Sequence, residues 1–282
     1  MVAVTAPDPL HPAARAAAAL RSARALVVTA GAGMGVDSGL PDFRGDAGFW
    51  GAYPPYRRLG ISFVDAANPA GFEGDPEFGW GFYGHRLGLY RRTVPHRGFA
   101  ILRSWIERLG LEAFVVTSNV DGQFQKAGFD PGRIEEVHGS IHHLQCTTPC
   151  GDAVWENHEE VPVDELTMRA ARTPRCPRCG AVSRPNILMF GDGAWIADRA
   201  HGQRRAFEGW LAGLGDAPLL VVELGAGTAI PTIRYATERL GSRPGATAVR
   251  LNPREPDIAA PHLSLPVGAL AGLEAIDAAL RG

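Results

Sequence analysis

Residues 29–45 read TAGAGMGVDSGLPDFRG and directly follow a β-branched, apolar run at 25–29 that predicts a buried strand. Gly31 and Gly33 lie just past that strand. Glycines at such a place let the backbone approach a diphosphate, and the amides of a following short helix can face it. The stretch is therefore typical of a nucleotide site in an α/β protein, although Gly31-x-Gly33 alone also occurs in ordinary tight turns.

Two features of this stretch argue against an ordinary dehydrogenase. Pro41 stops the short helix after barely two turns, where a dinucleotide crossover helix would continue. A second strand closed by an acidic residue, expected about 20 residues on to hold a ribose, does not follow. Instead Asp42, Phe43 and Arg44 form a loop beside the predicted phosphate site, which suits a lid over a nicotinamide that is expelled rather than reduced.

Composition sets broad limits on function. The chain has 282 residues, 28 basic and 30 acidic side chains and a net charge of -2, which gives no indication of nucleic acid or of an anionic membrane as a partner. No apolar run reaches the roughly 20 residues of a membrane-spanning helix. Residues 13–25 are rich in Ala and Arg, without a secretory pattern, and predict an opening helix. We therefore expect a cytoplasmic protein.

The order of the predicted elements indicates one α/β unit built on a doubly wound, Rossmann-like parallel sheet. Strands are predicted at 25–29, 113–117, 218–224 and 246–251, and helices at 13–24, 95–109, 198–214, 231–240 and 268–280. Residues 51–94, rich in Gly, Pro and aromatics, predict a helical insertion with a helix at 76–92. Residues 141–186 predict a small metal module. The Rossmann-like part is then 13–50, 95–140 and 187–282.

Polar residues follow the second predicted strand and precede the cysteine segment. Asn119 and Asp121 come just after the strand at 113–117, and ligands in open α/β sheets bind beyond the carboxyl ends of strands. The alternative is an Asx turn with solvated side chains. His138 is followed by Gly139 and can accept a proton near pH 7, with the glycine leaving room for a substrate. A lone histidine is more often structural.

All four cysteines lie between positions 146 and 179. Cys146-x3-Cys150 and Cys176-x2-Cys179 are spaced as two pairs of thiolate ligands for a tetrahedral Zn²⁺. Four thiolates leave no open position, so this zinc would be structural. Two disulfides or free thiols are the alternatives, which the lack of a secretion signal disfavours. His142 and His143 are spare ligand candidates.

Further candidates lie in the helical insertion and after the later strands. Tyr83 and Arg86 share a helix face, where a hydroxyl and a guanidinium can form a fork for a carboxylate, although such a pair is usually only part of an amphipathic helix. Gly225-Ala226-Gly227 and Asn252 follow predicted strands, so their backbone groups and the Asn252 side chain can contact a ligand.

Taken together, these motifs resemble the sirtuins, the NAD-dependent protein-lysine deacylases. The resemblance rests on the glycine stretch, on 117–122 (TSNVDG), on His138-Gly139, on the paired cysteines and on 189–192 (MFGD), and it covers most of the chain in family order. It implies NAD as co-substrate, structural zinc and acyl-lysine proteins or peptides as partners. The pair Tyr83 and Arg86 resembles that of sirtuins that remove succinyl, malonyl or glutaryl groups.

The resemblance also implies a role for each site residue. His138 is the base that deprotonates a ribose hydroxyl, which then attacks the alkylamidate formed when the acyl oxygen displaces nicotinamide. Asn119 orients a water and the ribose, and Asp121 holds the nicotinamide carboxamide. Phe190-Gly191 pairs with the substrate backbone. The remaining NAD contacts are expected from Gly31, Ala32, Gly33, Asp42, Phe43, Arg44, Ser118, Gly225, Ala226, Gly227 and Asn252.

Several positions depart from the family pattern. Ser118 stands where Gln is usual, Ala226 and Gly227 replace hydroxyl residues, and Arg254 replaces an acid, with Glu255 adjacent. These departures leave open mono-ADP-ribosyl transfer or NAD hydrolysis on the same scaffold, and a non-enzymatic, zinc-bearing NAD sensor. Deacylation is the leading prediction because Asn119, Asp121 and His138 are all present.

Overall fold

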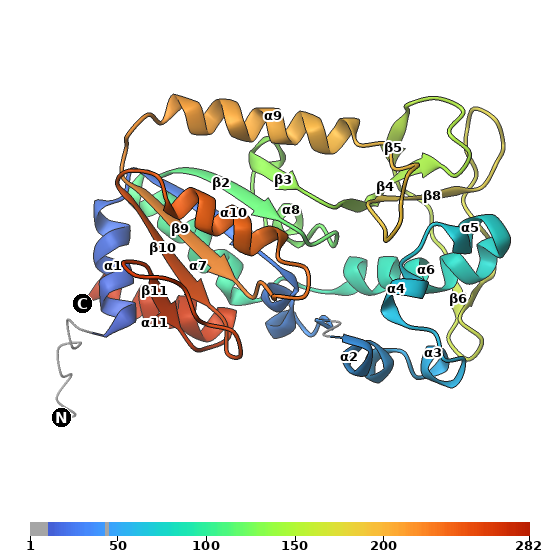
Figure 1. Cartoon of the computed structure of the whole chain (residues 1–282), viewed down its shortest axis with the longest axis horizontal. Coiled ribbons are helices and arrows are strands. Elements are labelled where there is room, and N and C mark those ends of the chain that lie inside the picture. The colour runs from blue at the N-terminus through green and yellow to red at the C-terminus, as the bar shows by residue number, and fades with distance from the viewer. Residues whose placement is uncertain (1–10, 43–44) are drawn as a thin grey trace.

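The computed structural model describes residues 11–42 and 45–282, apart from the side chains of 45–47. A six-stranded parallel sheet forms one half of the molecule, with strand order β11-β10-β9-β1-β2-β3 (Figure 1). The strands are β1 (Ala25–Ala30), β2 (Glu112–Thr117), β3 (Ile134–Glu136), β9 (Leu219–Leu224), β10 (Ala246–Leu251) and β11 (Leu263–Leu265). The order reverses between β1 and β9, which is where doubly wound sheets bind ligands. The predicted fold class is confirmed.

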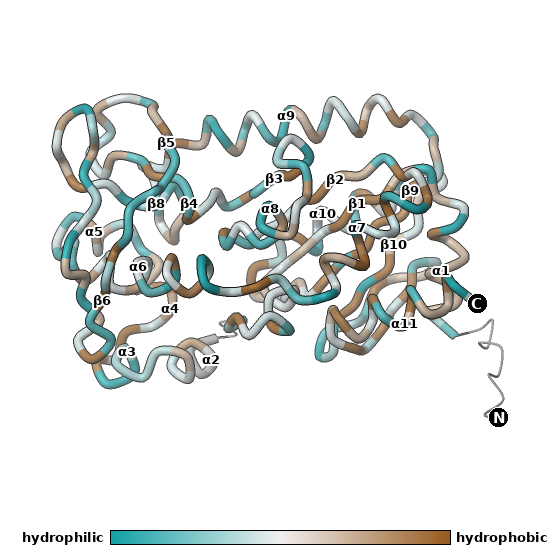
Figure 2. Tube along the Cα trace, turned by 180° about the vertical axis from the view of Figure 1, so that it is seen from behind, coloured by the Kyte–Doolittle hydropathy of each residue, from teal (hydrophilic) through white to brown (hydrophobic). Residues whose placement is uncertain are grey.

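Helices cover both faces of this sheet because successive strand residues alternate between them. Leu26 and Val28 of β1 pack on the face covered by α1 (Pro12–Ser22), α7 (Arg97–Leu109) and α11 (Ala269–Arg281). Val27 packs on the other face, under α9 (Asp198–Gly213) and α10 (Thr232–Gly241). Brown, hydrophobic segments accordingly run through the strands of this sheet in Figure 2.

The other half of the molecule combines the predicted helical insertion with the cysteine segment. Its helices are α2 (Gly45–Ala52), α3 (Pro54–Arg58), α4 (Phe63–Ala66), α5 (Ala70–Gly74) and α6 (Pro76–Arg92). An antiparallel sheet of order β5-β4-β8 joins Val154–Glu156, Gly139–Cys146 and Ser183–Ile187, and a short hairpin pairs β6 (Val163–Asp164) with β7 (Arg169–Ala170). Segments 51–94 and 141–186, predicted as a helical insertion and a metal module, share one hydrophobic core.

Close packing of α6 on the β6–β7 hairpin explains why the two segments form one core. A Cβ at Gly81 would lie 1.7 Å from the carbonyl oxygen of Met168, so only glycine fits there. Three short elements complete the chain: η1 (Ala32–Ser38), α8 (Gln123–Lys126) and η2 (Pro131–Arg133). The predicted short helix after β1 is the 3₁₀ helix η1. It is capped by Gly39, which lies in the left-handed region (φ 82°) two residues before Pro41.

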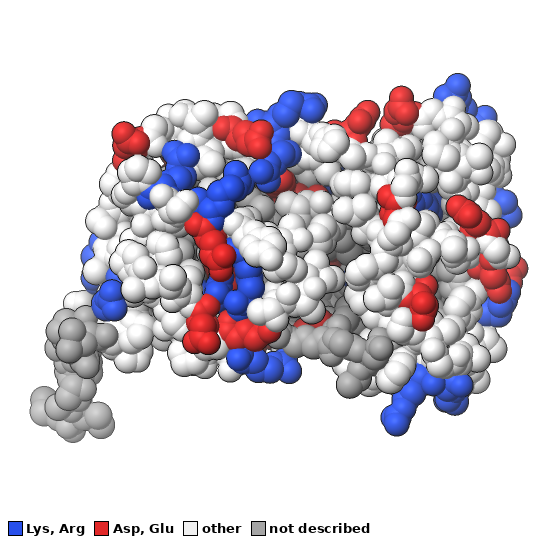
Figure 3. All heavy atoms as spheres, viewed as in Figure 1, with Lys and Arg blue, Asp and Glu red and all other residues white. Residues whose placement is uncertain are grey.

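Among the described residues, no helix is both long and apolar enough to cross a bilayer. On the face of the molecule shown in Figure 3, acidic and basic side chains are interspersed.

Candidate active site and zinc centre

A cavity of about 380 Å³ opens at the carboxyl ends of β1, β2 and β9, where the strand order reverses. Most of the predicted site residues line it together: Gly31, Ala32, Asp42, Tyr83, Arg86, Ser118, Asn119, Asp121, His138, Phe190, Gly225, Ala226 and Gly227. Gly33, Gly191 and Asn252 are not among its lining residues. Phe43 and Arg44 lie outside the described residues. One cavity thus joins the glycine turn, the histidine, and Tyr83 and Arg86 of α6.

The glycines after β1 have a packing role that the sequence did not reveal. A Cβ at Gly31 would lie 2.8 Å from Cα of Ala226, and one at Gly33 would lie 2.6 Å from Cα of Gly225. The Gly31 and Gly33 N–H groups donate to the carbonyls of Leu224 and Gly225. These glycines therefore let the loops after β1 and β9 touch, which leaves Ala32 on the cavity wall.

Asn119 is fixed at the end of β2 by two hydrogen bonds. Its backbone N–H donates to Thr117 Oγ1 at 3.0 Å, and its side-chain Nδ2 donates to the Gly31 carbonyl at 3.0 Å. Because the amide nitrogen is used by Gly31, the carbonyl oxygen Oδ1 remains as an acceptor for a ligand.

Asp121 has an unusual environment for a carboxylate. Only 8 % of the surface of this residue is exposed to solvent, and its Oδ1 accepts a hydrogen bond from the Gln123 N–H at 2.9 Å. Desolvation raises the pKa of Asp121 to about 6, with a further rise from Glu136 and an opposing effect of the Arg86 charge. A ligand amide that donates to this carboxylate would replace part of the lost hydration.

His138 lies between β3 and β4, with its ring against the loops after β2 and β9. Burial lowers the pKa of His138, partly offset by a hydrogen bond to the Ser118 backbone. Nε2 lies 3.4 Å from Thr232 Oγ1 at the start of α10. We infer that Nδ1–H donates to Ser118, so that Nε2 of the neutral imidazole is the acceptor.

Gly139, which follows the histidine, is required by the protein rather than by a substrate. Its φ is 79°, and a Cβ there would lie 2.1 Å from the carbonyl oxygen of Asn186 in β8. The glycine therefore lets β4 leave the histidine and pair with β8.

A cluster of aromatic rings surrounds the Arg86 guanidinium on α6. Its Cζ lies 5.0 to 5.7 Å from the ring centroids of Phe82, Tyr83 and Tyr90, and its Nε donates to the Tyr90 hydroxyl at 2.8 Å. Burial raises the pKa of Tyr83 and of Tyr90, so both phenols stay protonated donors near neutral pH. Tyr90 also lines the cavity, and the sequence did not predict it as a site residue. Its i+4 spacing from Arg86, which places both on one helix face, could have indicated it.

The segment after β8 is held in place from two sides. The N–H groups of Leu188 and Phe190 donate to the carbonyls of His138 and Ala67, both at 3.0 Å. The Asp192 carboxylate is buried against Arg184 and accepts the Met189 N–H at 3.3 Å. The carbonyl groups of 188–190 and Gly191 are thus the groups that an added strand could use.

Asn252 joins two loops instead of lining the wall of the cavity. It is fully buried, with Nδ2 donating to the Ala226 carbonyl at 2.9 Å and Oδ1 accepting from the N–H groups of Arg254 and Glu255. The Glu255 carboxylate bonds the Thr228 hydroxyl and N–H. Glu255 therefore supplies an acidic side chain beside Thr228, although Arg254 stands at the position where the family has the acidic residue.

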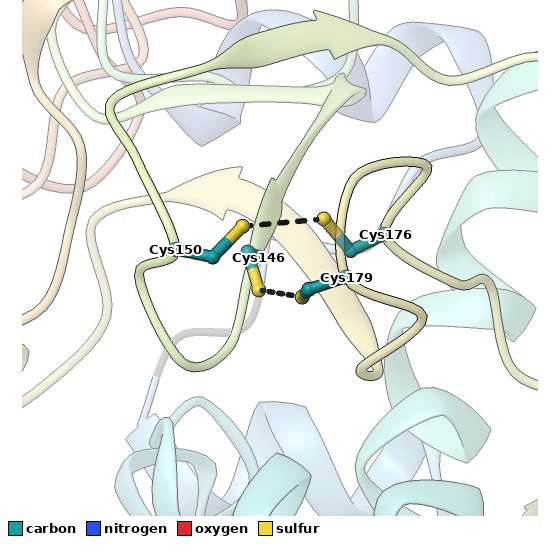
Figure 4. A group of neighbouring side chains, drawn as sticks. All are labelled: Cys146, Cys150, Cys176 and Cys179. Carbon is teal, nitrogen blue, oxygen red and sulfur yellow. Dashed lines mark hydrogen bonds between the residues drawn. The ribbon is translucent and has the colours of Figure 1, made fainter.

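The four cysteines form a compact cluster (Figure 4). All four sulfur atoms lie within 4.8 Å of one another, and the Cys146–Cys179 and Cys150–Cys176 separations are 3.6 and 3.7 Å. Tetrahedral Zn²⁺ with Zn–S bonds of about 2.3 Å needs sulfur separations of about 3.8 Å, so the cluster fits a structural zinc, whereas the sulfurs are too far apart for disulfides.

The two spare histidine candidates lie away from the cysteine cluster. Among the described residues, the metal-competent group contains only the cysteines, and His142 Nε2 instead contacts the Asp121 carbonyl at 3.0 Å.

Comparison with known proteins agrees with this geometry. Residues 31–204, more than half of the chain, match the model of the Sir2 family. The chain is 34% identical over 249 residues to an NAD-dependent protein deacylase of Methylococcus capsulatus, covering 84% of this chain and 85% of that protein. It is 33% identical over 175 residues to an NAD-dependent protein deacylase of Aeropyrum pernix, covering 61% of this chain and 62% of that protein.

Solved structures give the same answer for the fold. A mutant Sir2 homologue in complex with ADP-ribose superposes with a TM-score of 0.68 at 25% identity, covering 95% of this chain and 96% of that one. A Sir2 homologue–NAD complex gives a TM-score of 0.65 at 24% identity, covering 95% and 92%. By its sequence match and by the fold that carries its site, this chain belongs to the Sir2 family.

Proposed function

We propose that this protein is an NAD-dependent protein-lysine deacylase. The observation that carries the proposal is the single cavity that His138 shares with the glycine turn and with Asn119 and Asp121 at the reversal of strand order. The names of its relatives support the same activity. The residues present also fit NAD, because amide, hydroxyl and carboxylate groups from four loops converge on this cavity.

Each polar residue has a role that its hydrogen bonds permit. The neutral imidazole of His138 accepts the proton of a ribose hydroxyl at Nε2, since we assign the bond to the Ser118 backbone to Nδ1–H. The Asn119 Oδ1 positions the ribose or a water, because Nδ2 is held by Gly31. The buried carboxylate of Asp121 accepts the carboxamide N–H groups of nicotinamide. Bound NAD supplies the reactive glycosidic carbon at which nicotinamide is displaced by the acyl oxygen.

The substrate peptide is proposed to lie along residues 188–191. Leu188 and Ile230 are 40% and 46% exposed and line the cavity, so they offer apolar contacts on either side of an inserted lysine chain. The N–H groups of residues 188–190 already donate hydrogen bonds within the protein. The peptide therefore pairs mainly with the carbonyl groups of this segment.

For the acyl group, we propose an acidic chain such as succinyl, malonyl or glutaryl. Tyr83, Arg86 and Tyr90 place two phenols and a guanidinium on the wall of the cavity that also holds His138. The Tyr90 oxygen accepts the Arg86 Nε–H, which fixes the guanidinium and leaves the phenolic hydrogen to donate elsewhere. Charge-assisted bonds to a carboxylate in a buried site are strong and specific.

Arg86→Met is expected to lower kcat/KM for a succinyl-lysine peptide by about 100-fold and to change that for the matched acetyl peptide by less than about threefold. Tyr90→Phe is expected to lose about tenfold on the succinyl peptide, because Arg86 loses its orienting acceptor. Tyr56→Phe is the matched control, since its buried hydroxyl has no partner among the described residues. A wild-type preference for acetyl-lysine that Arg86→Met leaves unchanged would contradict the acidic-acyl assignment.

The activity itself is tested by mass spectrometry of acylated peptides incubated with and without NAD. Loss of the acyl mass only when NAD is present is the expected result. Gain of an ADP-ribosyl mass on the peptide would instead support transferase activity, and NAD consumption without any change in peptide mass would support hydrolysis of NAD alone.

A further inference from the structure

Lys126 is the one lysine in this chain, which has 28 basic residues in total. It lies at the end of α8 and is exposed, so a reagent in solution can reach it. If this protein is a lysine deacylase, it therefore carries a single lysine side chain of its own that can be acylated.

The Lys126 ammonium holds the C-terminal end of α6. Its Nζ donates to the carbonyl of Arg91 at 2.7 Å and to the carbonyl of Thr93. These carbonyls lie at the end of α6 (Pro76–Arg92), where helix carbonyls have no intrahelical partners and the helix dipole favours a cation.

A second bond between the same two helices strengthens this connection. Gln123, at the start of α8, donates from Nε2 to the carbonyl of Tyr90 at 3.0 Å and is buried. Helix α8 begins directly after Asp121 and Gly122, and α6 carries Tyr83, Arg86 and Tyr90. The Lys126 contact therefore joins the element after the proposed nicotinamide-binding loop to the helix of the proposed acyl pocket.

We propose that Lys126 is a modification site whose acylation lowers the activity of the protein. The donor is an acyl thioester. The Lys126 ammonium first gives one proton to water, and the resulting amine attacks the thioester carbonyl. The new N–C bond forms, the C–S bond breaks, and the second proton lost by nitrogen is taken by the thiolate that leaves. The product is a neutral amide with one N–H in place of the ammonium.

Acylation removes the charge and the second donor from this position. One of the two α6 carbonyls then loses its partner, and the favourable interaction with the helix C-terminus is lost. Fewer bonds then join the end of α6 to α8, although the Gln123–Tyr90 bond remains, so Tyr90 and Arg86 are held less firmly against the loop of Asp121. The expected loss of activity rests on the proposed deacylase function, whereas the expected loss of thermal stability does not.

The experiment compares wild type with Lys126→Arg, which keeps the charge and the donors but cannot be acylated by a thioester. Both folded proteins are incubated with acetyl-coenzyme A, and peptide mass spectrometry locates the added acetyl group. Acetylation at Lys126 of wild type is expected, with a fall in kcat/KM of about tenfold and in Tm of about 2–5 °C, while Lys126→Arg keeps both values.

Lys126→Gln, which mimics the neutral amide, is expected to reproduce the effect of acetylation. Arg205→Gln is the matched control, because it removes one exposed positive charge of α9 that makes no ion pair among the described residues. Acetylated wild type that keeps its activity and Tm, or a Lys126 that acetyl-coenzyme A never modifies, would overturn the proposal. If unmodified protein deacylates no peptide, the proposed function fails, and the Tm comparison still decides the role of Lys126.

Discussion

Replacement of His138 by alanine is expected to lower kcat/KM for deacylation by about a thousandfold or more, because general-base catalysis of this kind contributes roughly 10²–10⁴. The residue is half-buried in the turn between β3 and β4, so Tm is expected to change by only a few degrees. Steady-state kinetics with an acyl-lysine peptide and thermal unfolding of the same preparation provide the two measurements.

A finer readout separates the proposed role from a structural one. If His138 acts on the ribose hydroxyl after nicotinamide has been displaced, His138→Ala still forms nicotinamide in a single turnover but fails to release deacylated peptide. His201→Ala, an exposed histidine on α9, is the matched control and is expected to behave as wild type. Equal losses of nicotinamide formation and acyl removal would place the histidine in an earlier step.

The pH profile follows from the same assignment. Burial lowers the pKa of His138 below its usual value of 6.5, so the neutral, proton-accepting form dominates at pH 7. The acid limb of kcat/KM that this histidine contributes is therefore expected below pH 6.5, with no loss from it between pH 7 and 8.

Loss of a cysteine ligand is expected to have the second large effect. Cys176→Ser should abolish stoichiometric zinc binding and lower Tm by at least about 10 °C, since structural zinc contributes folding free energy directly. Ile187 and Met189 line the cavity from the core that this metal supports, so deacylation should be lost as well. Metal analysis, thermal unfolding and activity assays measure the three effects.

His143→Gln serves as the control for zinc content. His143 lies outside the sulfur cluster, so this variant is expected to bind as much zinc as wild type. Full zinc occupancy and an unchanged Tm in Cys176→Ser would contradict the assignment of the cluster as a structural metal centre.

Much of the fold follows from local signals in the sequence. The helix predicted at 76–92 is observed as α6 (Pro76–Arg92), because Pro76 suits a first helical turn and Asp75 caps it through the Phe78 N–H. The predicted strands at 25–29, 218–224 and 246–251 are observed within about one residue, because each is a mainly apolar run whose residues are largely buried on both faces.

Other features depend on contacts between distant segments, which no local pattern records. β3 (Ile134–Glu136) and β11 (Leu263–Leu265) are too short to show a period and form by pairing with β2 and β10. Gly33 predicted a phosphate-binding loop. In the fold a side chain at Gly33 would collide with Gly225, which is far away in sequence. The sequence predicts the other site residues as separate motifs. Tyr90 and Thr232 are recognised as part of the site only once the folded structure shows them beside Arg86 and His138.

The central claim is that NAD and an acyl-lysine meet in one cavity where His138 directs the ribose oxygen onto the acyl group. The most direct test is to identify the acyl acceptor by mass spectrometry after a single turnover of wild type with NAD and an acylated peptide. The account predicts acyl-ADP-ribose together with one nicotinamide for each acyl group removed. Release of the free carboxylic acid with NAD left intact would contradict it.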